Sequence, residues 1–173
     1  MSTKFKVDVS GAEVSFQEDK ITVKGPKGEL HEDIKHPFIH LSREGNTLLI
    51  QVDKDTSYQK AIGGTLAAAV RNMIIGVNQE YTAELELIYM HFPASLKASG
   101  NKLIVENFVG ERKPRELAIP EGVKLKVSGT KIYLSGTDKY LVGQAAGTIE
   151  GKIQIKNKDR RIFKDGIFIT KKP

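Results

Sequence analysis

The feature that most constrains the fold is a short pattern that occurs twice, with its copies 111 residues apart. Apolar residues alternate with other residues on both sides of a short break, and a glycine stands at each end. This pattern predicts a β-hairpin. The matching positions are Gly11, Val14, Phe16, Lys20, Ile21, Val23 and Gly25, and then Gly122, Leu125, Val127, Lys131, Ile132, Leu134 and Gly136. The repeat therefore predicts two related small domains rather than one larger domain.

Each half of the chain also carries a helix pattern. Apolar residues recur at spacings of three and four between Ile62 and Val77, after a possible capping residue at Asp55 or Thr56. A second, shorter pattern runs from Leu141 to Ile149; Thr137 or Asp138 can cap its start and Gly151 can end it. The adjacent glycines at 63 and 64 predict close backbone packing inside the first helix.

These patterns together indicate an α+β protein of the α/β-sandwich type. We expect two duplicated small domains, residues 1–80 and 81–173, each a mostly antiparallel sheet covered by one helix.

Positive charge is concentrated in the second half. Residues 1–80 contain 10 basic and 11 acidic residues, whereas residues 81–173 contain 17 basic and 10 acidic residues. The last 24 residues alone hold 8 basic and 3 acidic residues. A basic segment of this kind favours a polyanionic partner over a neutral one.

Several classes of function are disfavoured by residues that are absent or badly spaced. The chain has no Cys, which excludes a disulfide scaffold, a thiolate metal site and a Cys nucleophile. His36 and His40 flank Pro37 in a strand-like region, where residues four apart lie about 13 Å from each other, too far to share a metal. No phosphate-binding glycine motif or nucleophile elbow occurs. We expect neither enzymatic activity nor a cofactor, metal or small-molecule substrate.

The sequence also gives no sign of a membrane protein. Its first ten residues alternate charged and apolar residues, and the most apolar stretch, residues 67–77, is much shorter than the roughly 20 residues of a spanning helix. We therefore expect no membrane partner and a cytoplasmic location.

Apolar residues are interleaved with the basic residues near the C-terminus. Ile162, Phe163 and the run 166–169 predict that this segment is ordered, with its apolar side chains, including Phe163 and Phe168, anchored in a core. The adjacent Arg160 and Arg161 offer planar guanidinium groups that can each hold two phosphate oxygens. Such a surface is typical of a protein that binds a nucleic-acid backbone.

The run Lys156–Ile167, KNKDRRIFKDGI, closely resembles the C-terminal segment of the universal large-subunit ribosomal protein L6 family in its archaeal and eukaryotic form. Four further segments resemble the family in the same order along the chain. These are Val23–Leu30, His91–Pro93, Asn107–Glu111 and Gly136–Ala146.

The resemblance implies two duplicated domains and direct binding to large-subunit ribosomal RNA (rRNA). It places the main RNA contacts in the C-terminal domain, near the sarcin–ricin region and the translation-factor binding site, with neighbouring ribosomal proteins as further partners. It also implies that Asp159 and Asp165, which bacterial members lack, orient the two adjacent arginines. The RNA-binding residues it suggests are Lys139, Gln144, Lys152, Lys156, Lys158, Arg160, Arg161, Lys164 and Gly166.

A second hypothesis uses the same basic segment in a different way. A tandem-domain adaptor could dock the segment on acidic protein surfaces. The two hypotheses differ in salt dependence, because each phosphate that is neutralised adds about 0.7–0.9 to the slope of log affinity against log salt.

Overall fold

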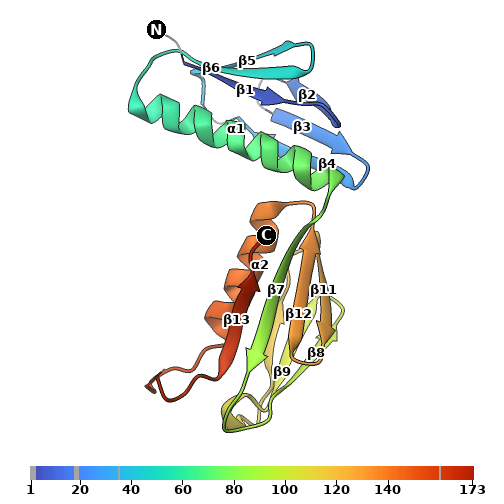
Figure 1. The fold of residues 1–173 in the computed structure, drawn as a ribbon, viewed down its shortest axis with the longest axis vertical. Coiled ribbons are helices and arrows are strands. Elements are labelled where there is room, and N and C mark those ends of the chain that lie inside the picture. The colour runs from blue at the N-terminus through green and yellow to red at the C-terminus, as the bar shows by residue number, and fades with distance from the viewer. Residues whose placement is uncertain (1–2, 18–19, 35, 160) are drawn as a thin grey trace. The chain divides into compact units, whose positions relative to one another are not determined.

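The structure, a computed structural model, describes residues 3–17, 20–34, 36–159 and 161–173. The chain divides into two compact units, Met1–Glu80 and Tyr81–Pro173, called unit 1 and unit 2 below. In the described residues each unit contains one α-helix and several strands, all paired antiparallel (Figure 1). The α+β class predicted from the sequence is therefore confirmed.

Unit 1 places two three-stranded sheets against one helix. The sheets have the strand orders β1-β6-β5 and β2-β3-β4, and helix α1 contacts strands of both. The elements are β1 (Lys4–Asp8), β2 (Glu13–Gln17), β3 (Lys20–Gly25), β4 (Gly28–Asp33), β5 (Ile39–Glu44), β6 (Thr47–Val52) and α1 (Ser57–Asn78).

Helix α1 begins where the sequence predicts. The hydroxyl of Thr56 accepts a hydrogen bond from the backbone N–H of Gln59, which satisfies one of the free donors at the helix start. Its buried face includes Leu66, Val70 and Val77. Gly63 is buried, and a Cβ there would lie 2.8 Å from the Phe5 ring, so the predicted close packing at this glycine is confirmed.

Unit 2 has a similar composition of elements but one more strand in one of its sheets. The strand orders are β10-β9-β8 and β11-β12-β7-β13. The elements are β7 (Tyr81–Ile88), β8 (Ser95–Ser99), β9 (Lys102–Glu106), the 3-10 turn η1 (Phe108–Gly110), β10 (Arg115–Ala118), β11 (Val123–Ser128), β12 (Lys131–Gly136), α2 (Lys139–Lys152) and β13 (Gly166–Lys171).

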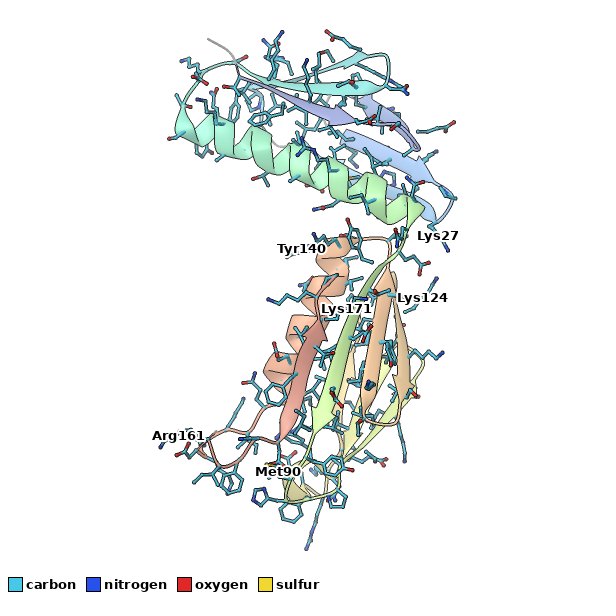
Figure 2. The ribbon with its side chains drawn as sticks, in the orientation of Figure 1. Lys27, Met90, Lys124, Tyr140, Arg161 and Lys171 are labelled. Atoms are coloured by element: carbon cyan, nitrogen blue, oxygen red, sulfur yellow. The ribbon has the colours of Figure 1, made fainter. Side chains whose placement is uncertain are left out.

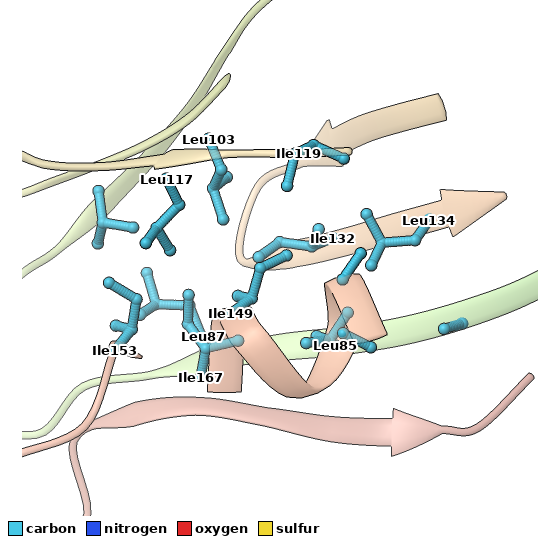
Figure 3. Close-up of a cluster of buried hydrophobic side chains, with 14 of the residues drawn as sticks. Leu85, Leu87, Leu103, Leu117, Ile119, Ile132, Leu134, Ile149, Ile153 and Ile167 are labelled. Atoms are coloured by element: carbon cyan, nitrogen blue, oxygen red, sulfur yellow. The ribbon is translucent and has the colours of Figure 1, made fainter. Parts of the chain in front are cut away.

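The core of unit 2 joins both of its sheets to α2. Leu85, Leu103, Ile132, Ile149 and Ile167 come from five different elements and are all at most 1% exposed. Figure 3 shows their side chains meeting between the strands and the helix. Strand β13 closes the sheet beside β7, so the basic segment between α2 and β13 is anchored at both ends.

The strands of the two predicted hairpins are present and pair in the same register. In unit 1 Val14 pairs with Val23, and at the equivalent positions of unit 2 Leu125 pairs with Leu134. The glycines that precede the hairpins have nearly the same left-handed backbone, with φ of 95° at Gly11 and 89° at Gly122. This conformation is easy for glycine and costly for other residues. The internal repeat therefore reflects a repeated local structure.

Some details differ from the sequence-based expectations. Each unit contains two small sheets where one was expected. Asp138 caps α2 by accepting from the N–H of Tyr140, but the helix continues past Gly151 to Lys152. Neither helix in the described residues is long and apolar enough to cross a membrane.

Candidate nucleic-acid interface

Three segments of unit 2 converge at one end of the unit. They are residues 89–94, 107–115, 152–159 and 161–165, which we call the basic end; the last two ranges belong to one segment. A Cβ at Gly110 would lie 3.2 Å from the Phe92 ring, and the amide of Asn107 donates to the carbonyl of Pro93 at 2.8 Å. Figure 2 shows Met90 and Arg161 at this end, with Tyr140 at the opposite end of the same unit.

Arg115 holds two of these segments together. Its guanidinium group binds both carboxylate oxygens of Glu111 and lies 4.5 Å from the ring centroid of Phe108. Nη1 of the same group donates to the carbonyls of Lys152 (3.2 Å) and Gln154 (3.4 Å). The pKa of Glu111 is lowered by its hydrogen bonds with this guanidinium. Arg115 therefore fixes the end of α2 and is not free to meet a ligand.

Asp165 ties the basic segment to the end of β7. Its side chain is only 1% exposed, and it accepts hydrogen bonds from the N–H of Met90 at 2.9 Å and from the ring of His91 at 3.4 Å. Burial raises the pKa of Asp165, but these hydrogen bonds together outweigh burial and leave the pKa lowered. The expectation that Asp165 orients the adjacent arginines is wrong for Arg161, because its carboxylate is directed to residues 90 and 91.

Phe163 forms a stack at the surface. Its ring lies 4.8 Å from the His91 ring, and the ammonium group of Lys158 lies 4.7 Å from its centroid. The side chain of Phe163 is half-buried, and Ile162 beside it is 62% exposed. The predicted anchoring in the core is thus correct for Ile167, which is fully buried, and wrong for Ile162.

Asp159 neutralises one of the two adjacent arginines. Its carboxylate accepts hydrogen bonds from Nε and Nη2 of Arg161, at 3.1 and 2.8 Å, and from the Arg161 backbone N–H. These bonds lower the pKa of Asp159, and the expected orientation of Arg161 by this residue is confirmed. The Arg161 side chain remains 90% exposed. Arg160 lies outside the described residues.

The remaining cations of the basic end have no carboxylate partner in the part of the chain that the structure describes. The acidic residues near them are already engaged, Glu111 by Arg115, Asp159 by Arg161 and Asp165 by residues 90 and 91. The exposed cations without such a partner are Arg112, Lys113, Lys152, Lys156, Lys158 and Lys164. This unbalanced charge is the main electrostatic property of the site.

Three of the residues suggested by the sequence lie away from this cluster or are buried within it. Lys139 is at the first turn of α2, about 20 Å along the helix from Lys152, and its ammonium group lies 5.6 Å from the Tyr81 ring centroid. Gln144 is exposed in the middle of α2. Gly166 is buried at the start of β13, where a Cβ would lie 3.2 Å from the Phe168 ring.

The profile of the family described as Ribosomal protein L6 matches residues 9–80 and 92–166. The chain is 40% identical over 162 residues to large ribosomal subunit protein uL6 of Methanosarcina mazei, covering 94% of this chain and 92% of that protein. It is 39% identical over 163 residues to the protein of the same name from Sulfurisphaera tokodaii, covering 94% and 88%. The chain belongs to the ribosomal protein L6 family.

Membership in the ribosomal protein L6 family agrees with the resemblance in the sequence, including its archaeal form. The relatives are ribosomal proteins, which are not enzymes, as the sequence predicts. Three of the segments that carry the resemblance, His91–Pro93, Asn107–Glu111 and Lys156–Ile167, all contribute to the basic end. The fourth in unit 2, Gly136–Ala146, forms the end of β12 and the start of α2.

Two cations of the basic end, and the residues that support it, were not predicted from the sequence. Arg112 and Lys113 lie in an otherwise unassigned loop, and only their position beside Arg115 connects them to the C-terminal segment. Met90 and His91 were not predicted to take part either. The segments His91–Pro93 and Asn107–Glu111 were the available signal, since both stand out in the resemblance without an assigned chemical role.

Proposed function

We propose that this protein is a structural component of the large ribosomal subunit in the cytoplasm and that it binds large-subunit rRNA through the basic end of unit 2. The observation that carries the proposal is the gathering, at one end of the unit, of exposed cations that have no carboxylate partner among the described residues. Membership in the ribosomal protein L6 family supports the same partner.

The chemistry of the site suits a phosphate backbone. Exposed Lys and Arg side chains bind most favourably to a partner that carries one negative charge per nucleotide, because binding releases condensed counterions. The lysines act as point charges on flexible stems, so they tolerate variation in phosphate position. Arg161 contributes less to the attraction of RNA than the lysines do, because Asp159 already neutralises its charge.

The proposed contacts fall into two groups. At the basic end they are Arg112, Lys113, Lys152, Lys156, Lys158, Arg161 and Lys164, and we add Arg160 from the sequence, since it lies outside the described residues. Lys139 and Gln144 on α2 form a separate contact, away from the first group. Gly166 serves the site indirectly, because its missing side chain leaves room for the Phe168 ring. We place the bound rRNA near the sarcin–ricin region and the translation-factor binding site, with neighbouring ribosomal proteins beside it.

Replacing Lys156, Lys158 and Lys164 together with Ala tests this proposal. The three side chains are exposed, so the fold should be retained. We expect the slope of log affinity against log salt to fall in magnitude by about 2–3 for large-subunit rRNA, because three phosphate contacts are lost. Filter binding or fluorescence anisotropy between about 50 and 200 mM salt measures this slope.

The matched control replaces three exposed lysines of unit 1, Lys4, Lys6 and Lys27, with Ala. This variant has the same change in net charge, so it reports the effect of overall charge alone. If both triple variants lowered the slope equally, the basic end would not be the contact surface. Binding to acidic proteins with no measurable rRNA affinity would favour the adaptor hypothesis instead.

A further inference from the structure

A cavity of 370 Å³ opens at the basic end, between the end of β7 and the basic segment. Ile88, Met90 and Ile155 form apolar walls, and the rings of Phe163 and Phe168 also line it. We call this cavity the tip pocket. Its volume falls in the range of about 300–1,000 Å³ that is typical of pockets for small organic groups.

The polar groups of the tip pocket are few and distinct. Lys164 is at its rim and is exposed. Gln154 lines the pocket, and its side-chain amide, which can both donate and accept, makes no hydrogen bond within the described residues. The carboxylate of Asp165 also lines the pocket, but it is already occupied by Met90 and His91.

We propose that the tip pocket holds one unstacked base of the bound RNA, with the following phosphate near Lys164. This inference rests on the proposed function and adds what the site would recognise beyond the backbone. Unpaired RNA bases are commonly inserted between aromatic or apolar side chains and read along their edges by hydrogen bonds. The apolar walls, the two rings and the free amide of Gln154 supply these interactions.

The charges around the tip pocket favour a base over an acidic peptide. Lys156, Lys158 and Lys164 lie in the basic segment and attract a polyanion of either kind. A peptide carboxylate that entered the pocket would meet the buried carboxylate of Asp165, and two like charges at close range repel each other. A base is neutral and places its charge outside, on the phosphate.

The structure holds the pocket walls in place. The Asp165 hydrogen bond to the N–H of Met90 fixes the end of β7 against the basic segment. On the other side, Gly166 allows the Phe168 ring to lie against the backbone, since a Cβ would be 3.2 Å from it. These contacts leave a preformed cavity, which reduces the entropy lost when a ligand is bound.

The test uses the full-length protein with purified, protein-free large-subunit rRNA. Ile88→Trp fills the pocket from a side chain that is 41% exposed, and Gln154→Ala removes the side-chain amide without removing any hydrogen bond found within the described residues. We expect affinity to fall about ten- to a hundred-fold for Ile88→Trp and about ten-fold for Gln154→Ala, with the salt slope unchanged in both. Base-specific chemical modification should show a nucleotide that wild type protects and Ile88→Trp leaves reactive.

The matched control is Ile75→Trp, which adds the same ring at a residue of α1 in unit 1 that is 50% exposed and does not line the pocket. It should leave affinity and base protection unchanged. Unchanged affinity and base protection in both pocket variants would overturn the inference while leaving backbone binding intact. A fall in the salt slope would also overturn it, because the pocket would then act through phosphates. Absence of salt-dependent binding by wild type would overturn the proposed function itself and this inference with it.

Discussion

Gly63 and Gly64 are neighbours in α1 but have different surroundings. A Cβ at residue 63 would lie 2.8 Å from the Phe5 ring and 3.0 Å from Val52, whereas at residue 64 the nearest atom would be 3.7 Å away. We expect Gly63→Ala to lower the free energy of unfolding by about 1–3 kcal/mol through overpacking. Gly64→Ala should raise it by about 0.4–1 kcal/mol, because Ala restricts the unfolded chain and clashes with nothing.

Thermal or urea unfolding followed by circular dichroism compares the two glycine variants directly. Each serves as the control for the other, since the change in composition and helix propensity is identical. A stabilising effect of both substitutions would show that Phe5 moves aside and that the close approach at Gly63 is not a constraint.

We expect Asp165 to make the free energy of unfolding of unit 2 depend on pH in the acid range. Its pKa is lowered in the folded state, so the stabilisation is fully present above the pKa of an unfolded Asp, about 3.9, and is lost as pH falls through the lower folded pKa. Asp165→Asn removes this titration. We expect the difference in unfolding free energy between wild type and variant to be largest above about pH 4 and to shrink in stronger acid.

Unfolding by urea at a series of pH values measures this difference. Full-length protein is suitable if the signal comes from unit 2, for example from a fluorophore attached near the basic end. A difference that stayed constant from neutral to strongly acid pH would mean that the charge of Asp165 contributes nothing and that only its shape matters.

At the scale of elements, Arg115 connects β10, η1 and the end of α2. Lysine would keep the charge but could not bind Glu111 with two parallel bonds while also reaching the carbonyls of Lys152 and Gln154. We expect Arg115→Lys to lower the free energy of unfolding by about 1–3 kcal/mol. Amide hydrogen exchange at the end of α2 should accelerate at the same time.

Arg112→Lys is the matched control, because Arg112 is exposed and has no ion pair in the described part of the chain. It should leave both stability and exchange unchanged. Equal effects of the two substitutions would show that lysine destabilises this segment at either position. The contacts of Arg115 would then not be the cause.

The sequence predicts those helices and strands whose pattern of apolar residues lies within a few neighbouring positions. Both repeated hairpins and both helices follow from spacing over a few residues, and their positions are confirmed. Strands β1, β8, β10 and β13 were not predicted. Most of β8 is exposed, so it has little alternation to detect. Strand β13 pairs with β7, whose residues come about 80 positions earlier, and no local pattern reveals such a partner.

Only the residues of the site that lie close together in the sequence could be predicted from it. The density of Lys and Arg in residues 152–164 identifies a basic segment without any structure. Which of its cations are free depends on acidic partners, and Asp165 pairs with residues more than seventy positions away. Arg112 and Lys113 join the same surface through packing between distant segments. Only the fold can assign them.

At the scale of the molecule, each unit has a separate core. The two clusters of buried apolar residues share no member, one lying in residues 7–77 and the other in residues 83–167. We propose that units 1 and 2 are independently folding domains with a boundary at residues 80–81. Fragments 1–80 and 81–173 should each give a cooperative thermal transition, and only the second should bind rRNA.

Calorimetry and rRNA binding by the two separate fragments check this expectation. The full-length chain provides the reference for both. If fragment 81–173 failed to fold, the core of unit 2 would depend on residues of unit 1. If fragment 1–80 bound rRNA with the steeper salt slope, the charge asymmetry of the chain would not explain its binding.

Strand β13 has a consequence for the order of events during synthesis. It supplies Ile167 to the core and pairs with the edge of β7, yet it leaves the ribosome that makes it after all the other strands of unit 2. Until then the basic segment is attached at one end only, and β7 offers an unpaired edge to other nascent chains. The core of unit 2 and the covered edge of β7 are therefore completed only once β13 has been synthesised.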